Sequence, residues 1–210
     1  MQESSRIGTT ALSLLVIVLA LYLILWQLLT TFFSFPVYYY GRLIELLATG
    51  LFAALAICIP LRFEDMGIVT PRGVLLRSLA FGGAVALFAV GALALTAHLR
   101  GTAPLFSWQL SGNVSRATYF LVAPFQEILA KSVMLYTLEL CFENKHPHRA
   151  NLCAALIFGA FHVVYGIEMM LLAMLLCFFT GLMFLRERCV WGCAVAHFAL
   201  GFFPACFGIG

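Results

Sequence analysis

The feature that most constrains this sequence is a series of long apolar runs with little polar chain between them. A helix of about 20 apolar residues crosses the hydrocarbon core of a bilayer. Inside lipid, backbone N–H and C=O groups must pair within the segment, and these runs are too unbroken for the alternating strands of a barrel. We therefore predict an all-α fold, a polytopic membrane helix bundle of about seven transmembrane helices. The candidate spans, of which the fifth and sixth are short and nearly fused, are 9–33, 43–61, 74–98, 117–140, 150–165, 168–185 and 190–208.

Composition supports one integral membrane domain over residues 1–210, with the lipid bilayer as its main partner. Hydrophobic residues make up 63% of the chain and charged residues 10%, and the mean hydropathy is +1.03. The net charge of +3 is spread between the apolar runs, so we expect no nucleic-acid partner. Cys189 and Cys193 would share a helix face, but no second cysteine pair or nearby histidine completes a zinc set. We predict neither a metal site nor another cofactor.

The distribution of Lys and Arg between alternate loops predicts the orientation of the chain. Cytoplasmic loops are enriched in these residues. The first apolar run is too long for the core of a signal peptide and lacks a small-residue cleavage site, so we expect it to be retained. We predict an integral protein of the bacterial inner membrane with a cytoplasmic N-terminus. The richer side holds Arg6, Arg62, Arg72, Arg77, Lys145, Arg149, Arg186 and Arg188, and the other side holds Arg42, Arg100 and Arg116.

A few ionisable residues fall inside the predicted spans, where each costs about 2.5–3.5 kcal/mol on insertion scales and needs a partner or a function. Glu127 and Lys131 lie in the fourth span, four residues apart on one helix face, which favours an ion pair. His162 lies in the fifth span and His197 in the seventh. A carboxylate and an imidazole that face one water molecule can activate it for hydrolysis. We therefore expect these residues to meet in one wet pocket within the bilayer.

Three segments in this part of the chain carry a family resemblance. The segment APFQEILAK at 123–131 resembles the first motif, EExxxR, of the CPBP family, the CAAX-protease and bacteriocin-processing proteins. The segment FGAFH resembles the second motif, FxxxH, with Phe158 and His162 at its fixed positions. The segment GLMFLR at 181–186 and the chain onward to His197 resemble the approach to the third motif, HxxxN. The resemblance covers residues 117–204, the motif-bearing core.

The resemblance implies an intramembrane endopeptidase of the glutamic type, which cleaves a membrane-associated or tail-anchored protein substrate. In the family, the first glutamate and the second-motif histidine are thought to activate water, and the third-motif histidine and asparagine stabilise the oxyanion. Carried over to this chain, His162 would polarise the water and His197 would donate to the oxyanion. The expected partner is therefore a protein or peptide substrate close to the membrane.

The chain departs from the family pattern at three positions, where Gln126 replaces the first glutamate, Lys131 replaces the arginine and Gly201 replaces the asparagine. An amide cannot accept a proton from water, so of the motif residues only Glu127 could act as the base. Neighbouring residues on a helix point about 100° apart, so Glu127 need not face the same site. Three explanations for Gln126 remain open: an inactive natural relative, a shifted set of catalytic residues, or a deliberate exchange that prevents cleavage.

Two other functions compete with the peptidase. Gln126 and Gly201 are compatible with a non-catalytic binding or scaffold protein that keeps the fold and a peptide-binding cavity. The buried ionisable residues are compatible with a small transporter or channel, although the sequence shows no internal repeat and no second charged relay.

Overall fold

The computed structural model describes residues 2–34, 37–59, 62–101 and 119–207, and within these ranges it is helical with no strand. This confirms the predicted all-α fold. Two short helical pieces interrupt the α-helices, the π-helix Ile128–Leu135 (η1) and the 3₁₀-helix Val163–Tyr165 (η2). The α-helices are α1 (Gln2–Phe32), α2 (Val37–Cys58), α3 (Arg72–Leu99), α5 (Tyr119–Glu127), α6 (Tyr136–Cys141), α7 (Pro147–Ala160), α8 (Ile167–Glu187) and α9 (Val190–Cys206).

Each predicted span corresponds to one helix or to a run of consecutive helices, but the helices differ in their ability to cross a bilayer. In the described part of the chain, three are long and apolar enough to do so alone: residues Arg6–Phe32 of α1, α3 and α8. Shorter apolar helical stretches lie at Glu45–Cys58 and Val190–Pro204. The 14 residues of α7 extend only about 21 Å, less than the roughly 30 Å of a hydrocarbon core. The short fifth segment therefore does not form a full span by itself.

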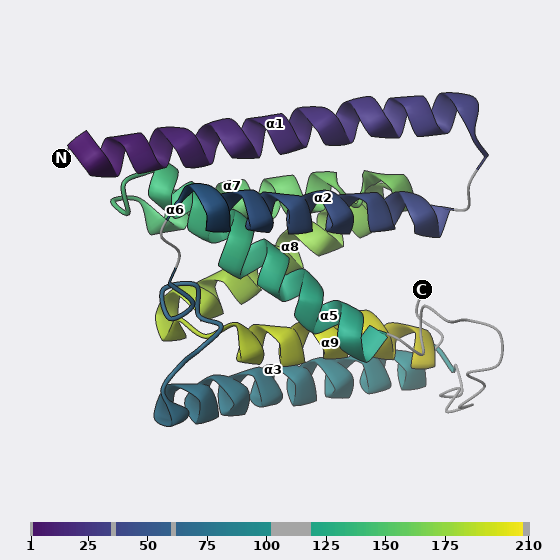
Figure 1. Ribbon diagram of the computed structural model, residues 1–210. Coiled ribbons are helices and arrows are strands. Elements are labelled where there is room, and N and C mark those ends of the chain that lie inside the picture. The colour runs from purple at the N-terminus through teal and green to yellow at the C-terminus, as the bar shows by residue number, and fades with distance from the viewer. Residues whose placement is uncertain (1, 35–36, 60–61, 102–118, 208–210) are drawn as a thin grey trace.

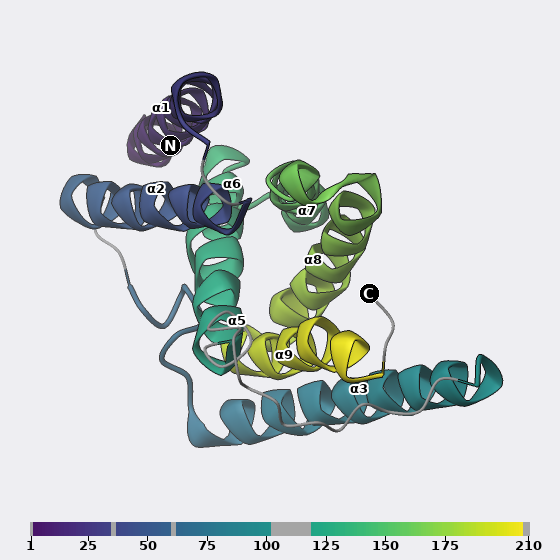
Figure 2. The same ribbon diagram turned by 90° about the vertical axis from the view of Figure 1, so that its right-hand side faces the viewer.

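When α5, η1 and α6 are taken as one stretch, successive helices run in opposite directions through the bundle (Figure 1). In both views α1 and α3 lie on opposite sides of the molecule, and the continuous helical stretch α5–η1–α6 crosses between them (Figure 2). Helix α9 packs between α3 and α5, and α7 packs against α8. The motif-bearing helices thus form the centre of the bundle.

Small residues allow α3 and α9 to approach closely. A Cβ atom added at Gly82 would lie 2.2 Å from the carbonyl oxygen of Gly192, and one added at Gly192 would lie 2.2 Å from the carbonyl oxygen of Ser78. Close contact of small residues is a usual way for helices to associate in membranes, where hydrophobic burial between helices contributes little.

We expect Gly82→Ala to destabilise the protein by about 1–3 kcal/mol, because the added methyl group meets a backbone carbonyl that cannot move independently. Gly83→Ala is the matched control, since a Cβ atom there meets nothing within 4 Å and alanine favours the helix. Thermal unfolding in detergent micelles measures both. Equal midpoints for Gly82→Ala and Gly83→Ala would contradict the close α3–α9 contact.

Candidate active site

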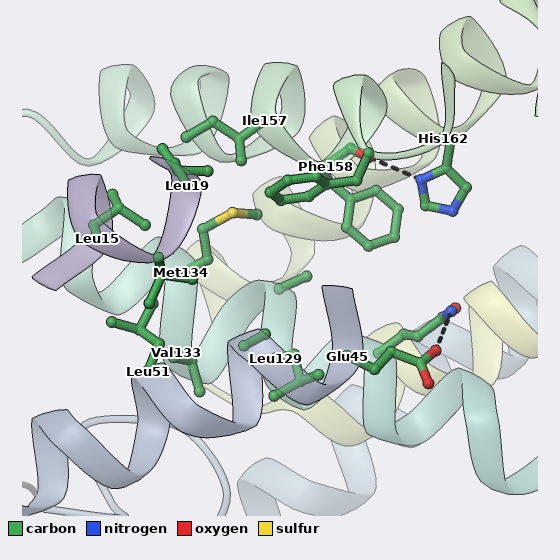
Figure 3. A pocket seen from close by; sticks show the side chains of 15 residues that line it. Leu15, Leu19, Glu45, Leu51, Leu129, Val133, Met134, Ile157, Phe158 and His162 are labelled. Carbon is green, nitrogen blue, oxygen red and sulfur yellow. Dashed lines mark hydrogen bonds between the residues drawn. The ribbon is translucent and has the colours of Figure 1, made fainter. Parts of the chain in front are cut away.

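A cavity of about 70 Å³ lies among α1, α2, α5–η1 and α7. Most of its wall is apolar, and the polar side chains Glu45, Gln126 and His162 also line it. Figure 3 shows Glu45 and His162 toward one end of the cavity and Leu15, Val133 and Met134 toward the other. The volume is sufficient for water, which needs two to four polar partners to be held in such a site. The other lining residues are Val18, Leu19, Ala48, Leu51, Leu129, Ala130, Ile157, Phe158 and Phe161.

His162 enters the cavity from a turn rather than from a helix. Helix α7 ends at Ala160, and His162 has φ −93° and ψ 0° just before η2, although it was predicted inside a span. Its Nδ1 lies 2.8 Å from the carbonyl oxygen of Phe158 (Figure 3). A carbonyl oxygen only accepts hydrogen bonds, so Nδ1 carries the proton, and Nε2 of the neutral ring is left as an acceptor. That arrangement suits a group that holds or polarises water.

Gln126 faces the cavity and binds a carboxylate from a different helix. Its Nε2 donates to Oε1 of Glu45 in α2 at 2.9 Å (Figure 3). Oε2 of Glu45 lies 2.7 Å from Nη1 of Arg42, and the Glu45 side chain is 13% exposed. The position at which the family has a glutamate is therefore an amide here, in direct contact with a carboxylate.

Glu127 points away from Gln126 and toward α9. Its Oε1 lies 2.8 Å from Nδ1 of His197, and its Oε2 lies 3.7 Å from Nζ of Lys131. All three side chains are at most 5% exposed. Lys131 also donates to the carbonyl oxygen of Cys177 at 2.9 Å. The carboxylate thus neutralises a buried cation and fixes the orientation of the His197 ring.

The predicted site residues therefore fall into two neighbouring groups rather than one cluster. Gln126, Phe158 and His162 line the cavity, whereas Glu127 and His197, together with Lys131, form the buried group beside it. The ring of Phe158 lies between these groups, with its centroid 4.7 Å from that of His162 and 6.2 Å from that of His197. Because Glu127 is engaged by His197 and Lys131, the geometry favours an orienting role for it over the proton-accepting role considered from the sequence.

The backbone of α5 and η1, which carries both Gln126 and Glu127, is irregular. Pro124 lies within α5 and has no N–H to donate to the preceding turn. The π-helix η1 begins directly after Glu127 and includes Lys131. Segments of π-helix are rare and often occur at functional sites, because the wider turn changes the direction of the side chains that follow.

Gly201, four residues after His197, lies against Tyr119. A Cβ atom at Gly201 would be 1.9 Å from the Tyr119 hydroxyl oxygen, so any larger residue there would require this phenol to move. The Tyr119 ring is also near His197, with 6.2 Å between ring centroids. The space that an asparagine side chain would need is thus occupied by a tyrosine.

Comparison with known proteins finds a family match, and it falls on this part of the chain. Residues 113–203 match the sequence model of the family described as type II CAAX prenyl endopeptidase Rce1-like. No curated protein sequence and no solved structure matches the chain. The matched region contains all three motif segments and every predicted site residue, which confirms the resemblance found in the sequence. The match covers less than half of the chain, and it supports membership of the motif-bearing core in the CPBP family of CAAX-protease-type peptidases.

Proposed function

We propose that this chain is an intramembrane endopeptidase that hydrolyses a peptide bond of a membrane-associated or tail-anchored protein, by the carboxylate-and-histidine chemistry of glutamic peptidases. The observation that carries the proposal is the largely apolar cavity in which His162 and Gln126 occupy positions of the family motifs. An apolar cavity accepts a lipid-adjacent segment of substrate, and its polar groups hold the attacking water.

His162 holds the water in this mechanism. With Nδ1 donating to the Phe158 carbonyl, Nε2 accepts a hydrogen of the water and directs its oxygen toward the scissile carbonyl carbon. A carboxylate accepts the other hydrogen as a proton, which the amide of Gln126 cannot do.

His197 stabilises the negative charge that develops on the carbonyl oxygen. Glu127 accepts a hydrogen bond from Nδ1 at 2.8 Å, so when the ring is protonated Nε2–H is the donor left for the oxyanion. A buried carboxylate that orients a histidine and stabilises its protonated form plays the same part in serine peptidases. Lys131 keeps Glu127 ionised in these apolar surroundings.

The family description suggests a first substrate to test, a prenylated peptide with a C-terminal CAAX sequence, because the matched proteins are described as CAAX prenyl endopeptidases. We further propose a bacterial inner-membrane location with a cytoplasmic N-terminus; the eight-to-three bias of Lys and Arg between alternate loops supports this orientation.

The test is cleavage by the purified chain in lipid nanodiscs, with a farnesylated CAAX peptide and a single-span tail-anchored protein as substrates. We expect a shortened product from at least one of them, and we expect His162→Ala to lower its rate at least about 100-fold. His98→Ala, in the exposed end of α3, is the control and should leave the rate unchanged. Equal cleavage by His162→Ala would rule out the proposed chemistry.

A second candidate is a binding or scaffold protein on the same fold, and the amide at Gln126 is the observation that favours it. Such a protein would bind the same peptides in the cavity without hydrolysing them. Peptide binding by the wild-type chain with no product after prolonged incubation would support this alternative.

A further inference from the structure

We propose that Glu45 of α2 is the general base of this hydrolysis and takes the role that Gln126 cannot fill. The inference rests on the proposed function and adds a catalytic residue that lies outside the matched region 113–203. The observation behind it is that a carboxylate from α2 reaches the cavity and contacts Gln126 there.

The position of Glu45 satisfies the first requirement for a base, which is access to the water. Of the 15 described residues that line the cavity, Glu45 is the one with a carboxylate. It lies toward the same end of the cavity as His162 (Figure 3). A water molecule at this end therefore has an imidazole nitrogen from the turn after α7 and a carboxylate from α2 as acceptors.

The hydrogen bonds of Glu45 leave it able to accept a proton. Arg42, at 2.7 Å, favours the ionised carboxylate in apolar surroundings. Gln126 donates one hydrogen bond to Oε1, and a carboxylate oxygen can accept two, so Oε1 retains capacity for water. The amide of Gln126 also fixes the direction of the carboxylate, which gives this residue a positioning role.

Glu127, the other carboxylate close by, is less suited to act as the general base. Its side chain is 1% exposed, and it does not belong to the cavity wall. Proton uptake by Glu127 would also leave the buried Lys131 without its anionic partner at 3.7 Å. Proton uptake by Glu45 leaves the Glu127–Lys131 pair intact.

Charge balance favours the carboxylate over His162 as the proton acceptor. Transfer of a proton from water to Glu45 moves one negative charge within the cavity, whereas transfer to neutral His162 would create two new charges in apolar surroundings. As the proton moves to Glu45, the water oxygen bonds to the carbonyl carbon and the C=O electron pair moves onto the carbonyl oxygen. When that pair returns, the C–N bond breaks, and the leaving nitrogen takes the proton from Glu45.

The test compares the wild-type chain with Glu45→Gln, Gln126→Glu and the double exchange of both, using the farnesylated peptide and the tail-anchored protein in nanodiscs. Glu45→Gln keeps a side-chain amide that can bond with Gln126, but this amide cannot accept a proton. We therefore expect the cleavage rate to fall by about 10²–10⁴-fold, as is typical for removal of a general base. The melting temperature of the variant should stay close to that of the wild type. The double exchange returns a carboxylate to the cavity and should recover at least about tenfold over Glu45→Gln. In Glu45→Ala, added formate should restore part of the rate by replacing the missing carboxylate. Glu168→Gln, in the exposed first turn of α8, is the matched control.

The outcomes separate this inference from the proposed function. If Glu45→Gln cleaves within threefold of wild type while His162→Ala does not cleave, the base is another group and the peptidase assignment stands. If the wild-type chain is inactive and Gln126→Glu cleaves, Glu45 does not act as a base and the inference is overturned. If neither the wild-type chain nor any exchange cleaves, the proposed function fails, and the inference with it.

Discussion

Glu127→Gln is expected to lower kcat by about 10²–10³-fold while leaving KM nearly unchanged. The carboxylate accepts a hydrogen bond from Nδ1 of His197 at 2.8 Å and stabilises the protonated ring. An amide at this position has no charge, so it cannot stabilise the protonated ring whose Nε2–H donates to the oxyanion. Removal of one donor to an oxyanion typically costs about 10²–10³-fold in kcat.

Steady-state cleavage in nanodiscs measures this effect, and thermal unfolding of the same preparation shows whether the variant is folded. Lys131 keeps its hydrogen bond to the Cys177 carbonyl at 2.9 Å, which limits the structural cost of the exchange. Glu127→Asp keeps the charge and should retain more activity than Glu127→Gln. A folded Glu127→Gln variant with kcat within threefold of wild type would remove Glu127 and His197 from the mechanism.

Arg188→Ala is expected to destabilise the protein by about 3 kcal/mol. Arg188 makes two hydrogen bonds to Glu139, of 2.7 and 2.6 Å, and thereby joins the end of α8 to α6. The Glu139 side chain is 2% exposed, and loss of the arginine leaves its charge buried without this partner. The backbone of Arg188 has φ 48°, and alanine there has the same left-handed strain, so the change reports on the side chain.

Thermal or denaturant unfolding in micelles tests this expectation. Arg186→Ala is the control, because the Arg186 side chain is 71% exposed and its 3.4 Å contact with Glu187 should contribute less than about 1 kcal/mol. Adding Glu139→Gln to Arg188→Ala removes the unpaired charge and should recover part of the lost stability. Equal destabilisation by the two arginine variants would show that the Glu139 pair contributes little.

The helices of this fold could be predicted from the sequence because long apolar runs in lipid have few alternatives to helix. The predicted span 74–98 differs from α3 (Arg72–Leu99) by two residues at its start and one at its end. The length of α7 could not be predicted in the same way, since the apolar character continues past Ala160 into the turn that carries His162. The π-helix η1 has no periodic pattern that distinguishes it from an α-helix.

The site residues that belong to sequence motifs could be predicted. Those that reach the site only through the packing of distant helices could not. The motifs identified His162 and His197, and the spacing of Glu127 and Lys131 identified their ion pair. Glu45 was missed because it lies near the start of its predicted span, 43–61, where a charged residue is ordinarily a solvated end. The sequence did offer one indication of its role, because Glu45 is an ionisable residue inside an apolar run, three residues after Arg42.

Tyr119 was missed for a different reason. Its contact with Gly201 joins residues 82 positions apart, and no local pattern predicts that a tyrosine occupies the space left by a glycine on another helix. Only the packing of α5 against α9 brings the two residues together. Where a motif residue is missing, the structure is therefore needed to show which side chain occupies its place.

The central claim, that water held by His162 is added across a peptide bond, can be measured directly by cleavage in H₂¹⁸O. The wild-type chain is incubated with the tail-anchored protein and the farnesylated peptide, and the new C-terminus is analysed by mass spectrometry. We expect one ¹⁸O atom in the new carboxylate of a product from the wild-type chain, and at least about 100-fold less of this product from His162→Ala in the same time. Absence of any cleaved product from the wild-type chain, or an equal yield of the labelled product from His162→Ala, would contradict the claim.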